Sequence, residues 1–200
     1  MDKKLTDEQL VKAAREAGIE PAALKAFAIV ESAGSGFLPD GRPKILFEGH
    51  IFHRQLKLKN IDPTPYLAKY PEIVYPKWDN SKYKGGVEEY QRLKIAESID
   101  KEAAWKSASW GMFQIMGFNY SICGYKNVYD FVAAMSTSEY NQLIAAIKLI
   151  QSMGLLPAIK DKNWKMVASR YNGPLYLQNQ YDKKLESAYR ANIKLNNINV

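Results

Sequence analysis

Many segments of this 200-residue sequence share one pattern, in which apolar residues return every three or four positions until a helix-ending signal closes the segment. Such spacing places the apolar side chains on one face of an α-helix. The pattern predicts helices over residues 7–17, 21–31, 87–98, 100–106, 129–135, 139–153, 164–171 and 185–193. A chain with this pattern is expected to be mostly α-helical.

The first two helices carry clear boundary signals. Thr6 and Gln9 have the spacing of a capping box, and Gly18 is a natural stop. Pro21 can occupy the first turn of the next helix, which ends at Glu31. The short connection between the two helices predicts a helical hairpin.

One short β element is expected between the helices. The Asp40–Gly41 turn signal separates an apolar pair at 37–38 from an apolar triplet at 45–47. This arrangement predicts a β-hairpin with Glu48 at the end of its second strand.

The stretch from 50 to 85 is irregular, because four prolines exclude a long helix through its middle: Pro63, Pro65, Pro71 and Pro76. It also carries five aromatic residues interleaved with charges: Tyr66, Tyr70, Tyr75, Trp78 and Tyr83. These rings can stack on sugars or form the core of an irregular lobe.

The composition is that of an ordinary globular protein, with 46% hydrophobic and 24% charged residues and neither a repeat nor a linker. Cys123 is the only cysteine, which excludes an intrachain disulfide and is typical of a reducing compartment. The start of the sequence lacks the apolar core of a secretory signal, and no apolar run approaches the ~20 residues that span a bilayer. Neither export by a signal peptide nor stable membrane insertion is expected.

The net charge of +7 comes from 28 Lys and Arg residues against 21 Asp and Glu residues, spread along the chain. A dispersed positive charge favours an anionic partner: nucleic acid, a charged polymer or a negative envelope surface. Solubility alone is the alternative explanation. Nucleic acid is disfavoured because the basic residues form no patterned patch.

Glu31 is the first candidate for catalysis. It shares a helix face with Leu24, Phe27 and Ala28, at positions i, i+3, i+4 and i+7. Apolar surroundings disfavour ionisation, so the pKa of Glu31 is expected to be raised, which suits a general acid. The alternative is a solvated carboxylate at a helix end.

Glu48 is the second candidate, because glycoside hydrolysis uses two carboxylates in different environments. Such pairs lie roughly 5–5.5 Å apart in retaining enzymes and about 6.5–9.5 Å apart in inverting ones. The alternative role for Glu48 is a structural salt bridge to Arg42 or Arg54.

Two further motifs suggest substrate contacts. In Ser109–Ile115, Gly111 allows close backbone approach, and the amide of Gln114 needs hydrogen-bond partners that a substrate hydroxyl or acetamido group can supply. Tyr171 and Asn172 end a helix, where side chains can face a cleft; a core tyrosine at a helix end is the alternative.

His50 and His53 lie close to Glu48 in the sequence, but the spacing is not that of a zinc-binding HExxH motif and no third ligand is evident. No metal or other cofactor is expected.

Three motifs follow one another along the chain: Glu31 at the end of an apolar helix, Ser109–Ile115, and Tyr171–Asn172. This order resembles that of the lysozyme-like superfamily, especially soluble lytic transglycosylases and goose-type lysozymes. The closer resemblance is to the N-acetylmuramidase family of phage endolysins. It is carried by ESAGSGFLPDGRPKILFEGHIF (31–52), SWGMFQIMGFNY (109–120) and RYNGP (170–174), and extends from the first helix to at least Tyr181.

The resemblance implies a two-lobed, mostly α lysozyme fold with a small β-hairpin beside the active-site cleft. It implies cleavage of the β-1,4 bond between N-acetylmuramic acid and N-acetylglucosamine in peptidoglycan, for host cell lysis. Glu31 would be the general acid and Glu48 the candidate second carboxylate. The substrate-binding positions would be Ser109, Gln114, Tyr171 and Asn172.

On this reading, residues 1–200 form one catalytic domain without a separate wall-binding module. The protein would be a monomer drawn to the anionic bacterial envelope, made in the cytoplasm of the producing cell and released to the peptidoglycan by a holin. Two alternatives stay open: a lytic transglycosylase that forms 1,6-anhydro-muramic ends, and a non-catalytic wall-binding or virion protein.

Overall fold

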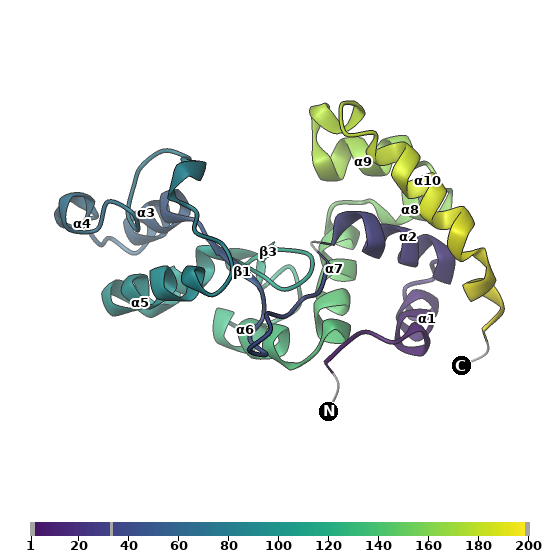
Figure 1. Ribbon diagram of the computed structural model, residues 1–200, viewed down its shortest axis with the longest axis horizontal. Coiled ribbons are helices and arrows are strands. Elements are labelled where there is room, and N and C mark those ends of the chain that lie inside the picture. Colours follow the sequence, from purple (N-terminus) through teal and green to yellow (C-terminus); the bar gives the residue numbers. More distant parts are fainter. Residues whose placement is uncertain (1–2, 33, 199–200) are drawn as a thin grey trace. The chain divides into compact units, whose positions relative to one another are not determined.

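The computed structural model describes residues 3–32 and 34–198, without the side chains of residues 172, 174 and 175. The chain is mostly helical, with one small antiparallel sheet, as expected (Figure 1). It divides into two compact units. The terminal unit comprises residues 1–34 and 138–200, and the inserted unit comprises residues 35–137.

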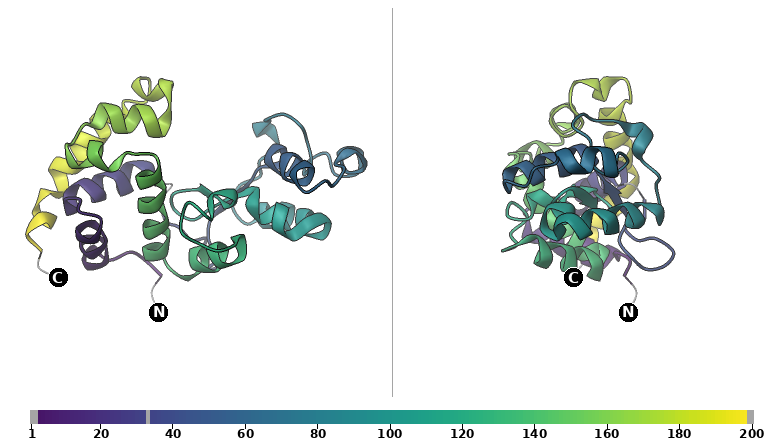
Figure 2. Two further views of the ribbon diagram at one scale, coloured as in Figure 1. Left: turned by 180° about the vertical axis from the view of Figure 1, so that it is seen from behind. Right: turned by 90° about the vertical axis from the view of Figure 1, so that its left-hand side faces the viewer.

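The regular elements among the described residues of the terminal unit are all helices. Its helices are α1 (Asp7–Glu16), α2 (Pro21–Glu31), α7 (Glu139–Ser152), α8 (Leu156–Lys160), α9 (Trp164–Asn172) and α10 (Tyr181–Asn192), with 3₁₀ turns at Pro174–Leu177 and Ile193–Asn197. Helix α2 packs along α10 and against α1 (Figures 1 and 2). Leu24 and Phe27 of α2 are fully buried, so this helix lies in the core of its unit.

The predicted helix boundaries of the N-terminal pair are confirmed. The Thr6 hydroxyl accepts a hydrogen bond from the Gln9 amide at 3.2 Å, and the Gln9 side chain accepts one from the Thr6 amide at 3.1 Å. Gly18, just after α1, has a φ of +63°, a conformation that glycine adopts without steric cost.

Glu20, the residue before α2, holds the C-terminal helices onto the start of α2. Its carboxylate accepts hydrogen bonds from Lys162 at 2.5 Å, Tyr189 at 2.8 Å and Asn196 at 3.2 Å. The hydrogen bond from Lys162 is the main reason that the pKa of Glu20 is lowered. These contacts fix the helix that carries Glu31 at its other end.

The inserted unit combines helices with the sheet. Its elements are β1 (Ile45–Phe47), α3 (Gly49–Leu58), α4 (Thr64–Lys69), α5 (Glu88–Lys106), β2 (Ala108–Trp110), β3 (Ile115–Met116) and α6 (Val128–Thr137), with 3₁₀ turns at Asn80–Lys82 and Gly117–Asn119. The strands are antiparallel in the order β1-β2-β3, with Leu46 opposite Ser109 and Ser109 opposite Met116.

A buried ion pair in α5 holds the inserted unit together. Glu89 and Arg92 are 0% and 4% exposed, and their charged groups lie 2.7 Å apart. Glu89 also accepts hydrogen bonds from the backbone amides of Phe47, Lys84 and Gly85. Arg92 donates to the carbonyl oxygens of Phe47 and Glu72. The end of β1 and two loop segments are therefore fastened to one turn of α5.

The predicted hairpin at 37–47 needs a correction. Its turn forms, with the Leu38 amide donating to the Arg42 carbonyl at 2.8 Å and an isolated bridge between Phe37 and Pro43. The strand 45–47, however, pairs with β2 rather than with residues 37–38. The turn signal is local, whereas the pairing of β1 is set by a contact far along the chain.

Helix α3 was not expected; it ends at Leu58, before the first of the four prolines. The division of the next helical region into two is confirmed, because α5 has a non-helical residue at Asp100, with φ −157° and ψ 111°. Within the part of the chain that the structure describes, no helix is long and apolar enough to cross a membrane.

Candidate active site

Glu31 is the last residue of α2 and is half-buried. The other members of its predicted face, Leu24, Phe27 and Ala28, are no more than 5% exposed. The apolar helix face inferred from the spacing is therefore present, and Glu31 stands at its end.

Tyr171 of α9 lies beside this face. Its ring meets that of Phe27 edge-on, with the centroids 5.1 Å apart and an interplanar angle of 84°. Burial, and then the charge of Glu31, raise the pKa of Tyr171, so its hydroxyl stays neutral in the physiological range. The structure thus brings together Glu31 and Tyr171. The side chain of Asn172, the next predicted contact, is outside the described part of the chain.

Ser109 and Gln114 belong to the inserted unit, where they hold the turn between β2 and β3. The Ser109 hydroxyl donates to the Gln114 side-chain oxygen at 2.8 Å, and the Gln114 amide donates to the Gly111 carbonyl at 2.7 Å. Gln114 has a φ of +47°, which is uncommon for a residue with a side chain. Its amide is thus supplied with protein partners, and its contact with substrate stays a prediction.

Glu48 is the residue between β1 and α3, and its side chain makes no capping hydrogen bond to the helix. Its side chain is 16% exposed and accepts a hydrogen bond from the Tyr83 hydroxyl at 2.5 Å. His50 Nδ1 lies 3.3 Å from the same carboxylate oxygen and has no hydrogen-bond partner among the described residues.

The salt bridges considered for Glu48 are absent from the described part of the structure. Arg42 pairs instead with Asp40 at 2.6 Å, and the Arg54 guanidinium lies over the ring of Phe118, 5.6 Å from its centroid. The tyrosine and histidine partners of Glu48 were not expected from the sequence. Tyr83 lies in the irregular stretch after the prolines, where no periodic pattern indicates which side chain faces which.

Histidine, cysteine and carboxylate side chains do not gather into a metal-binding group of three or more anywhere in residues 3–32 and 34–198. His53 is separate from the Glu48 cluster; its pKa is lowered by burial and then by the charge of Lys57.

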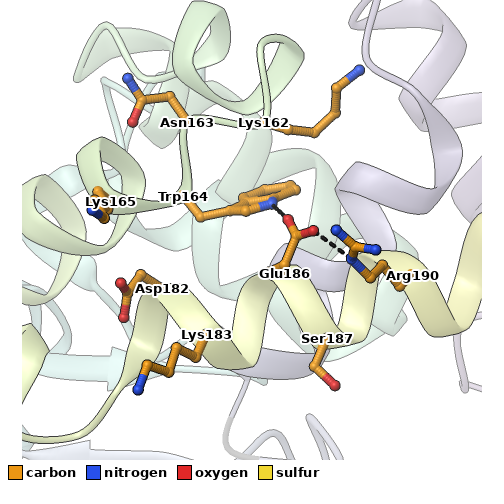
Figure 3. Close-up of a pocket in the computed structure, with 9 residues that line it drawn as sticks. All are labelled: Lys162, Asn163, Trp164, Lys165, Asp182, Lys183, Glu186, Ser187 and Arg190. Carbon is orange, nitrogen blue, oxygen red and sulfur yellow. Dashed lines mark hydrogen bonds and ion pairs between the residues drawn. The ribbon is translucent and has the colours of Figure 1, made fainter.

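A cavity of about 620 Å³ lies elsewhere in the terminal unit, between the start of α9 and α10 (Figure 3). At its centre the indole of Trp164 donates to Glu186 at 2.5 Å, and Glu186 pairs with Arg190 at 2.6 Å. Tyr171 is at the opposite end of α9, about 10 Å further at ~1.5 Å per residue. These polar groups are paired with one another, and the cavity is separate from Glu31.

Comparison with known proteins gives two findings. The family model for N-acetylmuramidase matches residues 20–192. The crystal structure of Burkholderia AP3 phage endolysin is similar, with a TM-score of 0.90 and 42% identity over 97% of this chain and 73% of that chain. No curated protein sequence matches.

Proposed function

Because this chain belongs to the N-acetylmuramidase family and is therefore a peptidoglycan-cleaving glycoside hydrolase of the endolysin type, we propose that Glu31 is its general acid. The bond cleaved is the β-1,4 linkage between N-acetylmuramic acid and N-acetylglucosamine. One observation carries the assignment: Glu31 ends a helix face whose other members are buried, next to the neutral hydroxyl of Tyr171.

In the proposed reaction, Glu31 gives its proton to the glycosidic oxygen as the bond from that oxygen to the anomeric carbon breaks. The N-acetylglucosamine end leaves as an alcohol, and positive charge develops on the muramic acid ring. Water then adds to the anomeric carbon and loses a proton, which restores the acid. The buried apolar residues that precede Glu31 on its helix face support this role.

We further propose Glu48 as the second carboxylate of the hydrolytic route. The hydrogen bond from Tyr83 and the nearby His50 ring fix the orientation of its carboxylate, as a charge-stabilising group requires. Ser109, Gln114, Tyr171 and Asn172 are proposed to contact the glycan.

Substitution of Glu31 by Gln tests the general acid. The change removes the transferable proton with almost no change in volume, so clearance of a peptidoglycan suspension should fall by about 10²–10⁴-fold while the circular dichroism spectrum is unchanged. Glu16→Gln is the matched control, since Glu16 is an exposed glutamate at the end of α1. Turnover by Glu31→Gln near the wild-type rate would refute the assignment.

Glu48→Gln separates two mechanisms. A loss of similar size to that of Glu31→Gln supports two carboxylates, and a loss of less than about tenfold supports a single acid. Mass spectrometry of the digest is the second measurement: reducing muramic acid ends support hydrolysis, and 1,6-anhydro ends would identify a lytic transglycosylase, in which the C6 hydroxyl of the sugar attacks instead of water.

The net charge of +7 supports attraction to the anionic bacterial envelope. We propose that the protein acts there as a monomer without binding nucleic acid, after synthesis in the cytoplasm and release by a holin. Fractionation of producing cells before and after expression of a holin tests the route: the activity should move from the cytoplasmic to the wall fraction only after the holin is made.

A further inference from the structure

The irregular stretch of the inserted unit contains one strongly exposed aromatic ring. Of the aromatic residues that suggested either sugar stacking or a core, Tyr75 is 7% exposed and belongs to the core, whereas Trp78 is 62% exposed. A solvent-facing indole leaves a large apolar face in water. The exposure of the Trp78 ring is therefore not explained by packing in the folded core.

The loop that carries Trp78 is held on both sides. The Asp79 side chain accepts a hydrogen bond from the Ser81 amide at 3.0 Å, and Lys82 pairs with Glu72 at 2.8 Å. Further along, the amides of Lys84 and Gly85 donate to the buried Glu89. The exposure of Trp78 is thus built into an anchored loop.

The side chain of Trp78 also lies close to that of Tyr83, whose pKa it influences. The Tyr83 hydroxyl in turn donates to Glu48 Oε2 at 2.5 Å. Burial and the hydrogen bond to Glu48 raise the pKa of Tyr83, so this hydroxyl remains a donor. The exposed ring therefore lies beside a tyrosine that is hydrogen-bonded to a carboxylate.

The Glu48 carboxylate keeps capacity for a ligand. Its side chain is 16% exposed, and a carboxylate can accept about four hydrogen bonds. Among the described residues, the Tyr83 hydroxyl donates one of these hydrogen bonds. An apolar platform beside a partly open acceptor suits a pyranose ring, whose C–H face is apolar and whose rim carries O–H and N–H donors.

We propose that Trp78, Tyr83 and Glu48 form a sugar-binding subsite that takes one N-acetylhexosamine residue of the glycan strand. The indole face stacks on the sugar ring, and Glu48 accepts a hydrogen bond from a hydroxyl or acetamido N–H group. Tyr83 is a positioning residue that orients the Glu48 carboxylate. The choice of glycan rests on the proposed function; the geometry of the subsite does not depend on Glu31.

Binding is measured on the full chain carrying Glu31→Gln, by calorimetry with a β-1,4-linked N-acetylglucosamine tetramer. Adding Trp78→Ala should weaken binding about tenfold, as expected for the loss of one stacked ring, and Trp78→Phe should retain most of it. Leu58→Ala is the matched control: Leu58 is 70% exposed on α3 of the same unit, and its removal should leave affinity unchanged.

A second readout uses the enzyme with Glu31 intact. Trp78→Ala should raise KM for peptidoglycan by about tenfold, because uniform binding of the glycan is lost, and change kcat much less. Unchanged affinity and unchanged KM in a Trp78→Ala protein with a native circular dichroism spectrum would overturn the subsite. If Glu31→Gln stays active, the general-acid assignment fails, and the affinity comparison between the Trp78 and Leu58 variants still tests the subsite.

Discussion

Tyr171 interacts electrostatically with Glu31. Its ring packs edge-on against Phe27, one helical turn before Glu31, and the charge of Glu31 contributes to the raised pKa of its hydroxyl. The ring and the hydroxyl are therefore proposed to have separable roles: the ring fills the core, and the hydroxyl supplies a neutral dipole beside the proposed general acid.

Tyr171→Phe should lower kcat about tenfold, equivalent to ~1.4 kcal/mol, because one polar contact near the acid is lost. The free energy of unfolding should change by less than about 1 kcal/mol, since the packing on Phe27 is kept. Activity assays on peptidoglycan and urea denaturation measure the two effects. A large loss of stability with unchanged kcat would show that Tyr171 is only a core residue.

Glu31 and Glu48 differ in how far their surroundings could be predicted. The face of Glu31 follows from spacing within one helix, so its apolar neighbours were identified correctly. The partner of Glu48 was sought in the nearby Arg42 and Arg54, but it is Tyr83, 35 residues away in sequence. No local sequence pattern indicates a contact between two residues that are so far apart in the sequence.

At the scale of elements, helix ends were predictable because their signals are local. The capping box of α1 and the division of α5 are set by neighbouring residues. The partner of β1 was not predictable in this way, because β2 lies more than sixty residues later and reaches β1 through the fold. The Glu89–Arg92 pair that fastens β1 to α5 also carries no sequence signature beyond two charges on a helix.

Gly49 opens α3 beside Glu48 and tests how tightly these elements pack. A Cβ atom there would lie 2.2 Å from the Tyr75 ring and 2.5 Å from the Ile73 carbonyl oxygen. Gly49→Ala should therefore lower the free energy of unfolding by about 3 kcal/mol, measured by urea denaturation. It should also reduce activity, because displacing Tyr75 removes the hydroxyl that accepts a hydrogen bond from the Gly49 amide, next to Glu48.

Gly41→Ala is the control for that substitution. Nothing lies within 4 Å of a Cβ at Gly41, and its φ of +82° is the only penalty, about 1 kcal/mol. Equal losses of stability in the two variants would show that crowding against Tyr75 is not the cause of the effect at Gly49.

At the scale of the whole molecule, the chain forms part of one unit, completes another, and then returns to finish the first. Each unit has a carboxylate that joins segments distant in sequence. Glu20 does so in the terminal unit with a partly exposed side chain, 40% accessible, and Glu89 does so in the inserted unit with no exposure. The buried group is expected to carry the larger share of stability, because removal of its charge leaves Arg92 buried without a counterion.

Glu89→Gln should cost about 3–5 kcal/mol of unfolding free energy at pH 7, measured by urea denaturation with tryptophan fluorescence. Glu102→Gln is the matched control, since Glu102 pairs with Lys106 with its side chain 37% exposed and should cost less than about 1 kcal/mol. Similar losses in the two variants would contradict the role given to the buried pair.

The same pair sets an acid limit for the protein. Burial alone would raise the pKa of Glu89, but backbone hydrogen bonds from Lys84, Gly85 and Phe47, with the charge of Arg92, hold it below its usual value. A carboxyl group with a lowered pKa stabilises the fold above its unfolded pKa of about 4.3, and this contribution is lost as the pH falls through the folded value. The unfolding free energy of the wild type should therefore fall below about pH 4 more steeply than that of Glu89→Gln, which has no carboxyl group to protonate at this position. Parallel pH profiles for the two proteins would show that Glu89 is not the group responsible.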